Sequence, residues 1–167
     1  MLPGEEGLTQ AFDDFMIQTE SGQLDAEATS QGLFSYILTK RQRSEIKKVC
    51  NENQWVDPEE KGITLTKDYF EHVLNQRKVK DKVTAKDCST ILASAYSKKS
   101  KVAINKPRFK GDRERDQQAL IFNAEESIRV GNSNGLYGVA IIEISIKNLS
   151  PVTAYHATRP KVTAFGR

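Results

Sequence analysis

Side chains able to transfer protons are few in this chain, and they lie in two short motifs. The 167 residues include only two histidines, His72 in DYFEHVLNQRK and His156 in VTAYHATR. An imidazole is able to take or give a proton at physiological pH. Arg77 follows His72 in the first motif, and Thr153 and Tyr155 precede His156 in the second. A hydroxyl and a guanidinium beside an imidazole bind a phosphate or stabilise developing negative charge.

Together these groups suit the cleavage of RNA without a metal ion. That reaction needs a base for the ribose 2′-OH, an acid for the leaving oxygen and cations for the phosphorane. We expect His72 and His156 to share the acid–base roles, and Arg77 with Thr153 or Tyr155 to stabilise the phosphorane. No cluster of carboxylates typical of a two-metal nuclease is visible, so we expect no metal and no other cofactor.

The same residues also have structural interpretations, which the sequence leaves open. A histidine at the border of a helix's apolar face, as at His72, often packs against a neighbour such as Tyr69. His156 and Tyr155 are equally acceptable as ordinary residues of a sheet. The sequence therefore offers candidates for catalysis and does not select among them.

Helical periodicity is expected to position His72 and Arg77. ITLTKDYFEHVLNQRK predicts a helix that starts at Thr66, with Asp68 near its N-terminus. Its apolar face consists of Tyr69, Phe70, Val73 and Leu74. Arg77 lies on this apolar side, so its head group must reach past the edge of the core. A second helix is predicted within VTAKDCSTILASAY, where Thr84 and Asp87 resemble a capping box.

After Tyr96 the apolar periodicity changes from that of a helix to that of a strand. Strands are predicted at 101–105, in QALIFNA, in ESIRVGN, at 136–147 and at 152–158, with turns at 132–135 and in NLSP. If the small apolar residues of the last strand face the helices, alternation puts Ala154 and His156 on that side, and Thr153 and Tyr155 on the open face. We therefore predict an α+β fold, with N-terminal helices followed by a twisted antiparallel sheet of about four to five strands.

Net charge divides the chain near residue 60. Residues 1–60 carry 5 Lys and Arg against 12 Asp and Glu, a net charge of −7, and residues 61–167 carry 20 against 10, a net of +10. We predict an acidic helical segment over 1–60, with helices in 7–18 and 24–50, and a basic α+β domain over 61–167. The basic part favours nucleic acid as a partner, and a solvated basic surface is the alternative.

A charged loop after the 101–105 strand is the expected contact with a nucleic-acid backbone. Its cations around Phe109 are Lys106, Arg108, Lys110, Arg113 and Arg115, and we expect the first four to contact the RNA backbone. Cations of this kind neutralise phosphates, and an aromatic ring stacks on a base. A solvated loop is again the alternative.

Several classes of protein and of site do not fit the sequence. The longest apolar stretch, 136–146, is too short to span a bilayer and is interrupted by Glu143. The N-terminus MLPGEEGLTQ has acids where a signal peptide needs a basic start, so we expect any export to depend on another system. Cys50 and Cys88 have neither a CxxC spacing nor a nearby histidine, which argues against a disulfide framework or a zinc site.

The order of these segments resembles the barnase–EndoU–colicin–RelE-like (BECR) nuclease superfamily, in its phage and polymorphic-toxin branches. The resemblance covers about 63–165 and rests on His72 with Arg77, and on Thr153, Tyr155 and His156 in the last strand. It implies a sheet whose exposed face holds RNA, and cleavage without metal, often of tRNA, to a 2′,3′-cyclic phosphate. The paired histidines of the EndoU branch and the Glu/Arg/His set of barnase are not found, so the general base stays open.

The division of charge also resembles the C-terminal toxin tip of a contact-dependent growth inhibition protein. That resemblance implies that residues 1–60 help the toxin enter a target bacterium, in whose cytoplasm the nuclease acts. It also implies a cognate immunity protein, expected to be acidic. A phage-borne protein fits the sequence as well. A non-catalytic phage or toxin-associated module that binds a host protein or nucleic acid is the alternative function, and an ADP-ribosyltransferase, suggested by YHATR, is less favoured.

Overall fold

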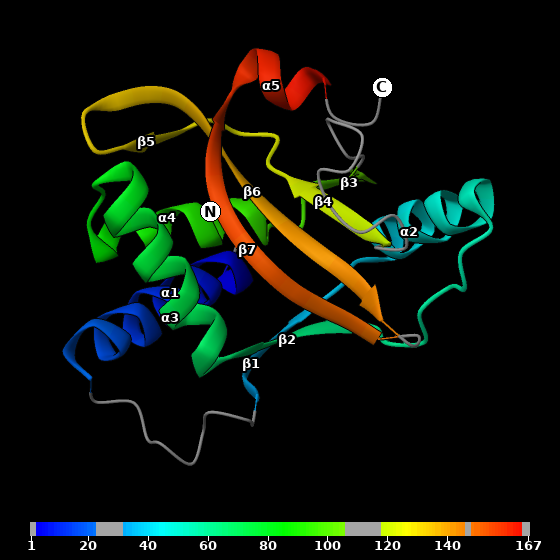
Figure 1. The fold of residues 1–167 in the computed structure, drawn as a ribbon, viewed down its shortest axis with the longest axis horizontal. Helices are drawn as coiled ribbons and strands as arrows, with labels where there is room; N and C mark the ends of the chain where they lie inside the picture. Colours follow the sequence, from blue (N-terminus) through cyan, green and yellow to red (C-terminus); the bar gives the residue numbers. More distant parts are fainter. Residues whose placement is uncertain (1–2, 23–31, 106–117, 146–147, 165–167) are drawn as a thin grey trace.

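The computed structural model describes residues 3–22, 32–105, 118–145 and 148–164, and the structural statements below concern these residues. Its elements, in chain order, are α1 (Pro3–Ser21), β1 (Gly32–Ile37), α2 (Lys40–Asn53), β2 (Gly62–Thr66), α3 (Lys67–Gln76), the π-helical turn η2 (Arg77–Asp81), α4 (Ala85–Ala95), β3 (Lys101–Ile104), β4 (Ala119–Asn123), β5 (Ile128–Val130), β6 (Ser133–Ser145), β7 (Asn148–Thr158) and α5 (Arg159–Ala164) (Figure 1). The predicted α+β class, with N-terminal helices and an antiparallel sheet, is confirmed.

Five antiparallel strands form the main sheet, with β6 at its centre. β4 and β5 pair with successive parts of β6, β7 pairs with β6 over most of its length, and β3 pairs with β4. β1 and β2 form a separate two-stranded sheet. Among the described strands β7 pairs with β6 alone, so it is an edge strand. An edge tolerates Pro151 because proline has no N–H to donate to a further strand.

Helices cover one face of this sheet. α4 lies against β6, and α1 packs against α3 and α4. Ala140, Ile142 and Ile144 of β6 face these helices and are buried in the main core. The short helix α5 lies on the other face, where Val162 packs on a small second cluster. That cluster consists of Ile121, Val139 and Ala157.

The acidic N-terminal segment shares the main core with the basic part of the chain. Phe12 and Met16 of α1 are fully buried, and the ring of Phe12 lies 6.2 Å from that of Phe70 and 6.0 Å from that of Tyr96. Ion pairs also join α1 to the helices beyond residue 60, from Asp13 to Lys86 at 3.1 Å and from Glu20 to Lys78 at 3.0 Å. The change in charge near residue 60 therefore falls within one continuous hydrophobic cluster.

The helix expected over 24–50 is wrong in its first half. Residues 23–31 lie outside the described part of the chain, 32–37 form β1, and α2 begins only at Lys40. The side chains of Ser35, Tyr36 and Ile37 are exposed, buried and exposed in turn, which is the alternation of a strand. Thr39 then starts α2 through a capping box with Gln42. The apolar residues of this segment fit both periods, and the pairing of β1 with β2 decides between them.

The strands after Tyr96 follow the prediction, with shifted turns. The predicted segments correspond to β3, β4, β5, β6 and β7. The β5–β6 turn lies at Gly131 and Asn132, because Val130 pairs with Ser133. Gly131 has a φ of +60°, which glycine adopts without strain. β7 begins at Asn148, inside the segment for which a turn is predicted.

The backbones of α4 and β6 come close together at Gly138. A Cβ at this position would lie 2.5 Å from the carbonyl oxygen of Ile91 and 2.8 Å from the amide nitrogen of Ala95. The Gly138 N–H donates to Ser94 Oγ at 3.1 Å. Only glycine permits such a contact between a helix and a strand.

We predict that Gly138→Ala destabilises the protein by about 3 kcal/mol, because the added methyl group forces α4 away from β6. Gly135→Ala in the same strand is the matched control. A Cβ there meets nothing within 4 Å, and its φ of +71° costs about 1 kcal/mol for alanine. Urea unfolding followed by circular dichroism measures the free energy of unfolding of both variants. Equal destabilisation by Gly138→Ala and Gly135→Ala would contradict the close contact between α4 and β6.

Candidate functional site

His156 faces the helical side of the sheet, as strand alternation predicts. It pairs with Gly138 in the β6–β7 register, and its neighbour Ala154 lies in the main core. The His156 side chain retains 22% of its exposure. Its Nδ1 is buried, lies 4.0 Å from Asp81 Oδ2, and has no hydrogen-bond partner among the described residues. The imidazole is thus held with one nitrogen turned toward a carboxylate.

Arg77 approaches the same carboxylate from the end of α3. Its Nη1 donates to Asp81 Oδ2 at 2.6 Å, and its side chain is only 12% exposed. Arg77 Nε is buried without a hydrogen-bond partner in the described part of the chain. Arg77 lies on the apolar side of the helix, as predicted, but its head group, which the sequence predicts to reach past the edge of the core, is itself largely buried. Asp81 neutralises the charge that this burial would otherwise leave unpaired.

The turn η2 brings Arg77 and Asp81 together. Its π-helical winding follows α3 directly, and Lys82 ends it with a left-handed φ of +54°. Thr84 then caps α4 and forms the predicted capping box with Asp87. Single π-helical turns are frequent at functional sites. The corner between α3 and α4 therefore holds a carboxylate at the edge of the core, within reach of β7.

We call Arg77, Asp81 and His156 the Asp81 cluster. A carboxylate facing Nδ1 of a histidine orients the ring and leaves Nε2 free to take a proton. The 4.0 Å separation is too long for a hydrogen bond, but such contacts often shorten only when substrate binds. The cluster thus combines an oriented imidazole with a guanidinium, which is the minimum for proton transfer beside a developing negative charge.

Two buried tyrosines hold β7 in place beside the cluster. The hydroxyls of Tyr69 and Tyr96 lie 2.9 Å apart, and Tyr69 also donates to the carbonyl oxygen of Thr153 at 3.2 Å. Burial raises the pKa of both tyrosines well above the usual value. Both hydroxyls therefore stay protonated at neutral pH, and their role here is to fix the strand that carries His156.

Cys88 lies near the cluster but does not act as a nucleophile. Burial raises the pKa of its thiol to about 12, although the Arg77 guanidinium offsets part of the rise. Burial likewise raises the pKa of Cys50 to about 11, with a further contribution from Asp57. Both cysteines are therefore protonated, unreactive thiols at neutral pH.

The structure separates the other predicted catalytic residues from His156. Thr153 and Tyr155 point to the opposite face of the sheet, where the Lys161 ammonium lies 5.0 Å from the centre of the Tyr155 ring. His72 is exposed on α3. It comes five residues before Arg77, which places it roughly 140° around the helix from Arg77. Arg77 and His156 are thus brought together, and His72 is not.

Asp81 is the residue of the cluster that the sequence reasoning missed. Its four-residue spacing from Arg77 is the one available signal, since such pairs face each other on a helix. The predicted phosphate contacts lie outside the described residues: Lys106, Arg108, Lys110 and Arg113. Exposed cations next to the cluster are Lys78, Lys80 and Lys82.

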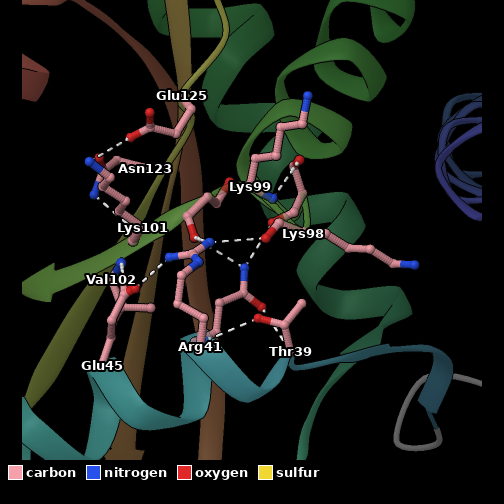
Figure 2. A network of polar contacts seen from close by, with 12 residues as sticks. Thr39, Arg41, Glu45, Lys98, Lys99, Lys101, Val102, Asn123 and Glu125 are labelled. Carbon is pink, nitrogen blue, oxygen red and sulfur yellow. Dashed lines mark hydrogen bonds and ion pairs between the residues drawn. The ribbon is translucent and has the colours of Figure 1, made fainter. Parts of the chain in front are cut away.

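A second polar network lies around the start of β3 (Figure 2). Arg41 donates to the carbonyl oxygens of Lys98 and Ser100, and Glu45 accepts from the Val102 N–H. These bonds attach α2 to the edge of the main sheet. Lys101 extends from the same region to Glu125, at 3.1 Å.

The described part of the chain holds neither a cluster of metal ligands nor a helix that could span a membrane. No three His, Cys, Asp or Glu side chains in this part of the chain come together as a metal site would require. None of the helices formed by these residues combines the length and the apolar character needed to cross a bilayer.

We predict that Asp81→Ala destabilises the protein by about 2 kcal/mol, because it leaves the Arg77 guanidinium buried without its carboxylate. Glu20→Ala is the matched control, since the Glu20–Lys78 pair is about half exposed on both sides. Glu20→Ala should lower the free energy of unfolding by no more than about 0.5 kcal/mol. Urea unfolding measures the free energy of unfolding of both variants. If Asp81→Ala lowers it no more than Glu20→Ala does, the Asp81 carboxylate is not needed for stability.

Comparison of the whole chain with protein-family models, with curated proteins and with solved structures finds no match. The likeness to the BECR nucleases therefore rests on the motifs described above, and the assignment stays a prediction.

Proposed function

We propose that this chain is an endoribonuclease that cleaves RNA without a metal ion, with His156 as the group that moves the proton. One observation carries the proposal: His156 Nδ1 faces Asp81, which also accepts from the Arg77 guanidinium. The arrangement supplies an oriented imidazole beside a fixed positive charge. Both are what attack of a ribose 2′-OH on the adjacent phosphate requires.

In this mechanism His156 acts as the base. Its Nε2 takes the proton of the 2′-OH, the 2′-oxygen attacks phosphorus, and the bond to the 5′-oxygen breaks. Because in-line attack places the leaving 5′-oxygen on the far side of phosphorus from this imidazole, water gives that oxygen its proton and the imidazolium returns its own proton to solvent, so the products are a 2′,3′-cyclic phosphate and a free 5′-OH. Arg77 has donors beyond the one used by Asp81, and these stabilise the phosphorane.

Exposed lysines beside η2 extend this site toward the RNA backbone. Lys80 and Lys82 are solvent-exposed next to Asp81, in the part of the chain that carries a net charge of +10. Such cations neutralise phosphates without reading the base, so binding should weaken steeply as salt rises. RNA, including tRNA, is the substrate class that this chemistry suits.

The resemblance to the C-terminal tips of contact-dependent inhibition toxins suggests where the nuclease acts. On that basis the nuclease acts in the cytoplasm of a target bacterium after delivery by another system. An acidic immunity protein that covers the basic surface would protect the producing cell. The ion pairs from Asp13 and Glu20 of α1 to Lys86 and Lys78 illustrate how carboxylates occupy that surface.

The test is cleavage of total bacterial RNA by purified protein in excess EDTA. We predict discrete fragments ending in a 2′,3′-cyclic phosphate, and a rate for His156→Ala lower on the order of 10²- to 10⁴-fold. His72→Ala is the matched control, because it removes the other histidine from an exposed position and should cleave at the wild-type rate. Circular dichroism confirms that each variant is folded.

Other outcomes would redirect the proposal. If His72→Ala and His156→Ala reduce the cleavage rate equally, both histidines take part in proton transfer, as expected from the sequence. Cleavage that appears only after a divalent ion is added would sink the metal-independent mechanism. Intact RNA under all conditions, from folded protein, would favour a non-catalytic module that binds nucleic acid or a host protein.

A further inference from the structure

A cavity lies on the sheet face opposite the Asp81 cluster, between the β3–β4 hairpin and α5. It has a volume of about 420 Å³, within the range of pockets that hold small ligands. Its polar lining residues are Lys101, Asn123, Glu125, Tyr137, Arg159 and Thr163. Val162 and Ala103 give it an apolar side. The cavity thus combines converging polar groups with a wall suited to a sugar or a base.

Arg159 is held in this cavity by an aromatic ring rather than by an acid. Its Nη1 donates to the Tyr137 hydroxyl at 2.9 Å, and its guanidinium carbon lies 5.9 Å from the centre of that ring. Tyr137 is only 7% exposed, so the support is rigid. No carboxylate of the described residues forms an ion pair with Arg159. A positioned guanidinium of this kind retains donors for an oxyanion.

Lys101 brings a second positive charge, which is held only loosely. Its ammonium lies 3.1 Å from Glu125, and both side chains are largely exposed, at 63% and 43%. An exposed ion pair contributes little to stability, so an incoming anion is able to replace the carboxylate. Asn123, which is 7% exposed, donates to the Lys101 carbonyl oxygen at 3.0 Å and fixes the strand beneath this lysine (Figure 2).

We propose that this cavity binds the phosphate group of a nucleotide. Arg159 supplies a forked contact to two phosphate oxygens, Lys101 leaves Glu125 to join it, and the side formed by Val162 and Ala103 receives the sugar or base. The phosphate is either a phosphodiester within an RNA chain or the phosphomonoester of a free nucleotide. The inference rests on the proposed function only for the first of these sources.

The test measures binding by calorimetry at low salt, in the 167-residue chain carrying His156→Ala so that RNA is not cleaved. Inorganic phosphate, a 3′-mononucleotide and a short RNA oligonucleotide are the probes. Arg159→Gln should weaken binding about tenfold, and Arg159→Lys less, since lysine keeps the charge without the fork. Glu125→Gln should strengthen binding a few-fold, which a merely structural role of Glu125 would not produce.

Arg129→Gln is the matched control, because it removes the same charge from an exposed arginine in β5. Mononucleotide binding that depends on Arg159 supports a phosphomonoester ligand, and dependence seen only with the oligonucleotide supports a phosphodiester. Equal weakening by Arg129→Gln, or no effect of Arg159→Gln with any probe, overturns the proposal. If the wild-type protein cleaves RNA but no binding depends on Arg159, the pocket proposal fails and the nuclease proposal stands. If binding depends on Arg159 but the wild-type protein does not cleave RNA, the nuclease proposal fails and the pocket proposal stands.

Discussion

The contact between α4 and β6 at Gly138 sets the distance between the helices and the sheet. A side chain at this position would meet the backbone of α4, so the two elements come together only because residue 138 is glycine. Gly138 is also the β6 partner of His156. The imidazole therefore leaves β7 opposite the point where the sheet lies nearest to α4, and the turn η2 directly precedes that helix.

Two further interactions fix the position of β7, which is an edge strand of the main sheet. Pairing with β6 holds one side of it, and the Tyr69 hydroxyl holds the Thr153 carbonyl oxygen on the side of α3. Because side chains alternate along a strand, His156 reaches the helical face while Tyr155 reaches the opposite one. β7 thus carries His156 on the helical face of the sheet and, on the opposite face, Tyr155, whose ring lies beside Lys161 of α5.

The sequence predicts those features that depend on local physics. The caps at Thr66 and Thr84, the place of Arg77 on the apolar side of its helix and the alternation around His156 each follow from spacing within a few residues. The sequence predicts a helix where the structure has β1, because the apolar residues there fit a helix and a strand equally well. Only the pairing with β2, about 30 residues further along the chain, decides between the two. The partnership of Asp81 with His156 and that of Arg159 with Tyr137 join residues distant in sequence, so no local pattern reveals them.

In the proposed mechanism, reacting RNA lies against His156 and not against His72. Because the chain has only these two histidines, their imidazole signals are readily assigned by NMR. The direct measurement is a titration with an RNA oligonucleotide whose 2′-hydroxyls are methylated, so that it binds without being cleaved. The account predicts that the His156 signals shift as binding saturates while those of His72 stay in place. Shifts confined to His72, or none at either histidine despite binding, would contradict it.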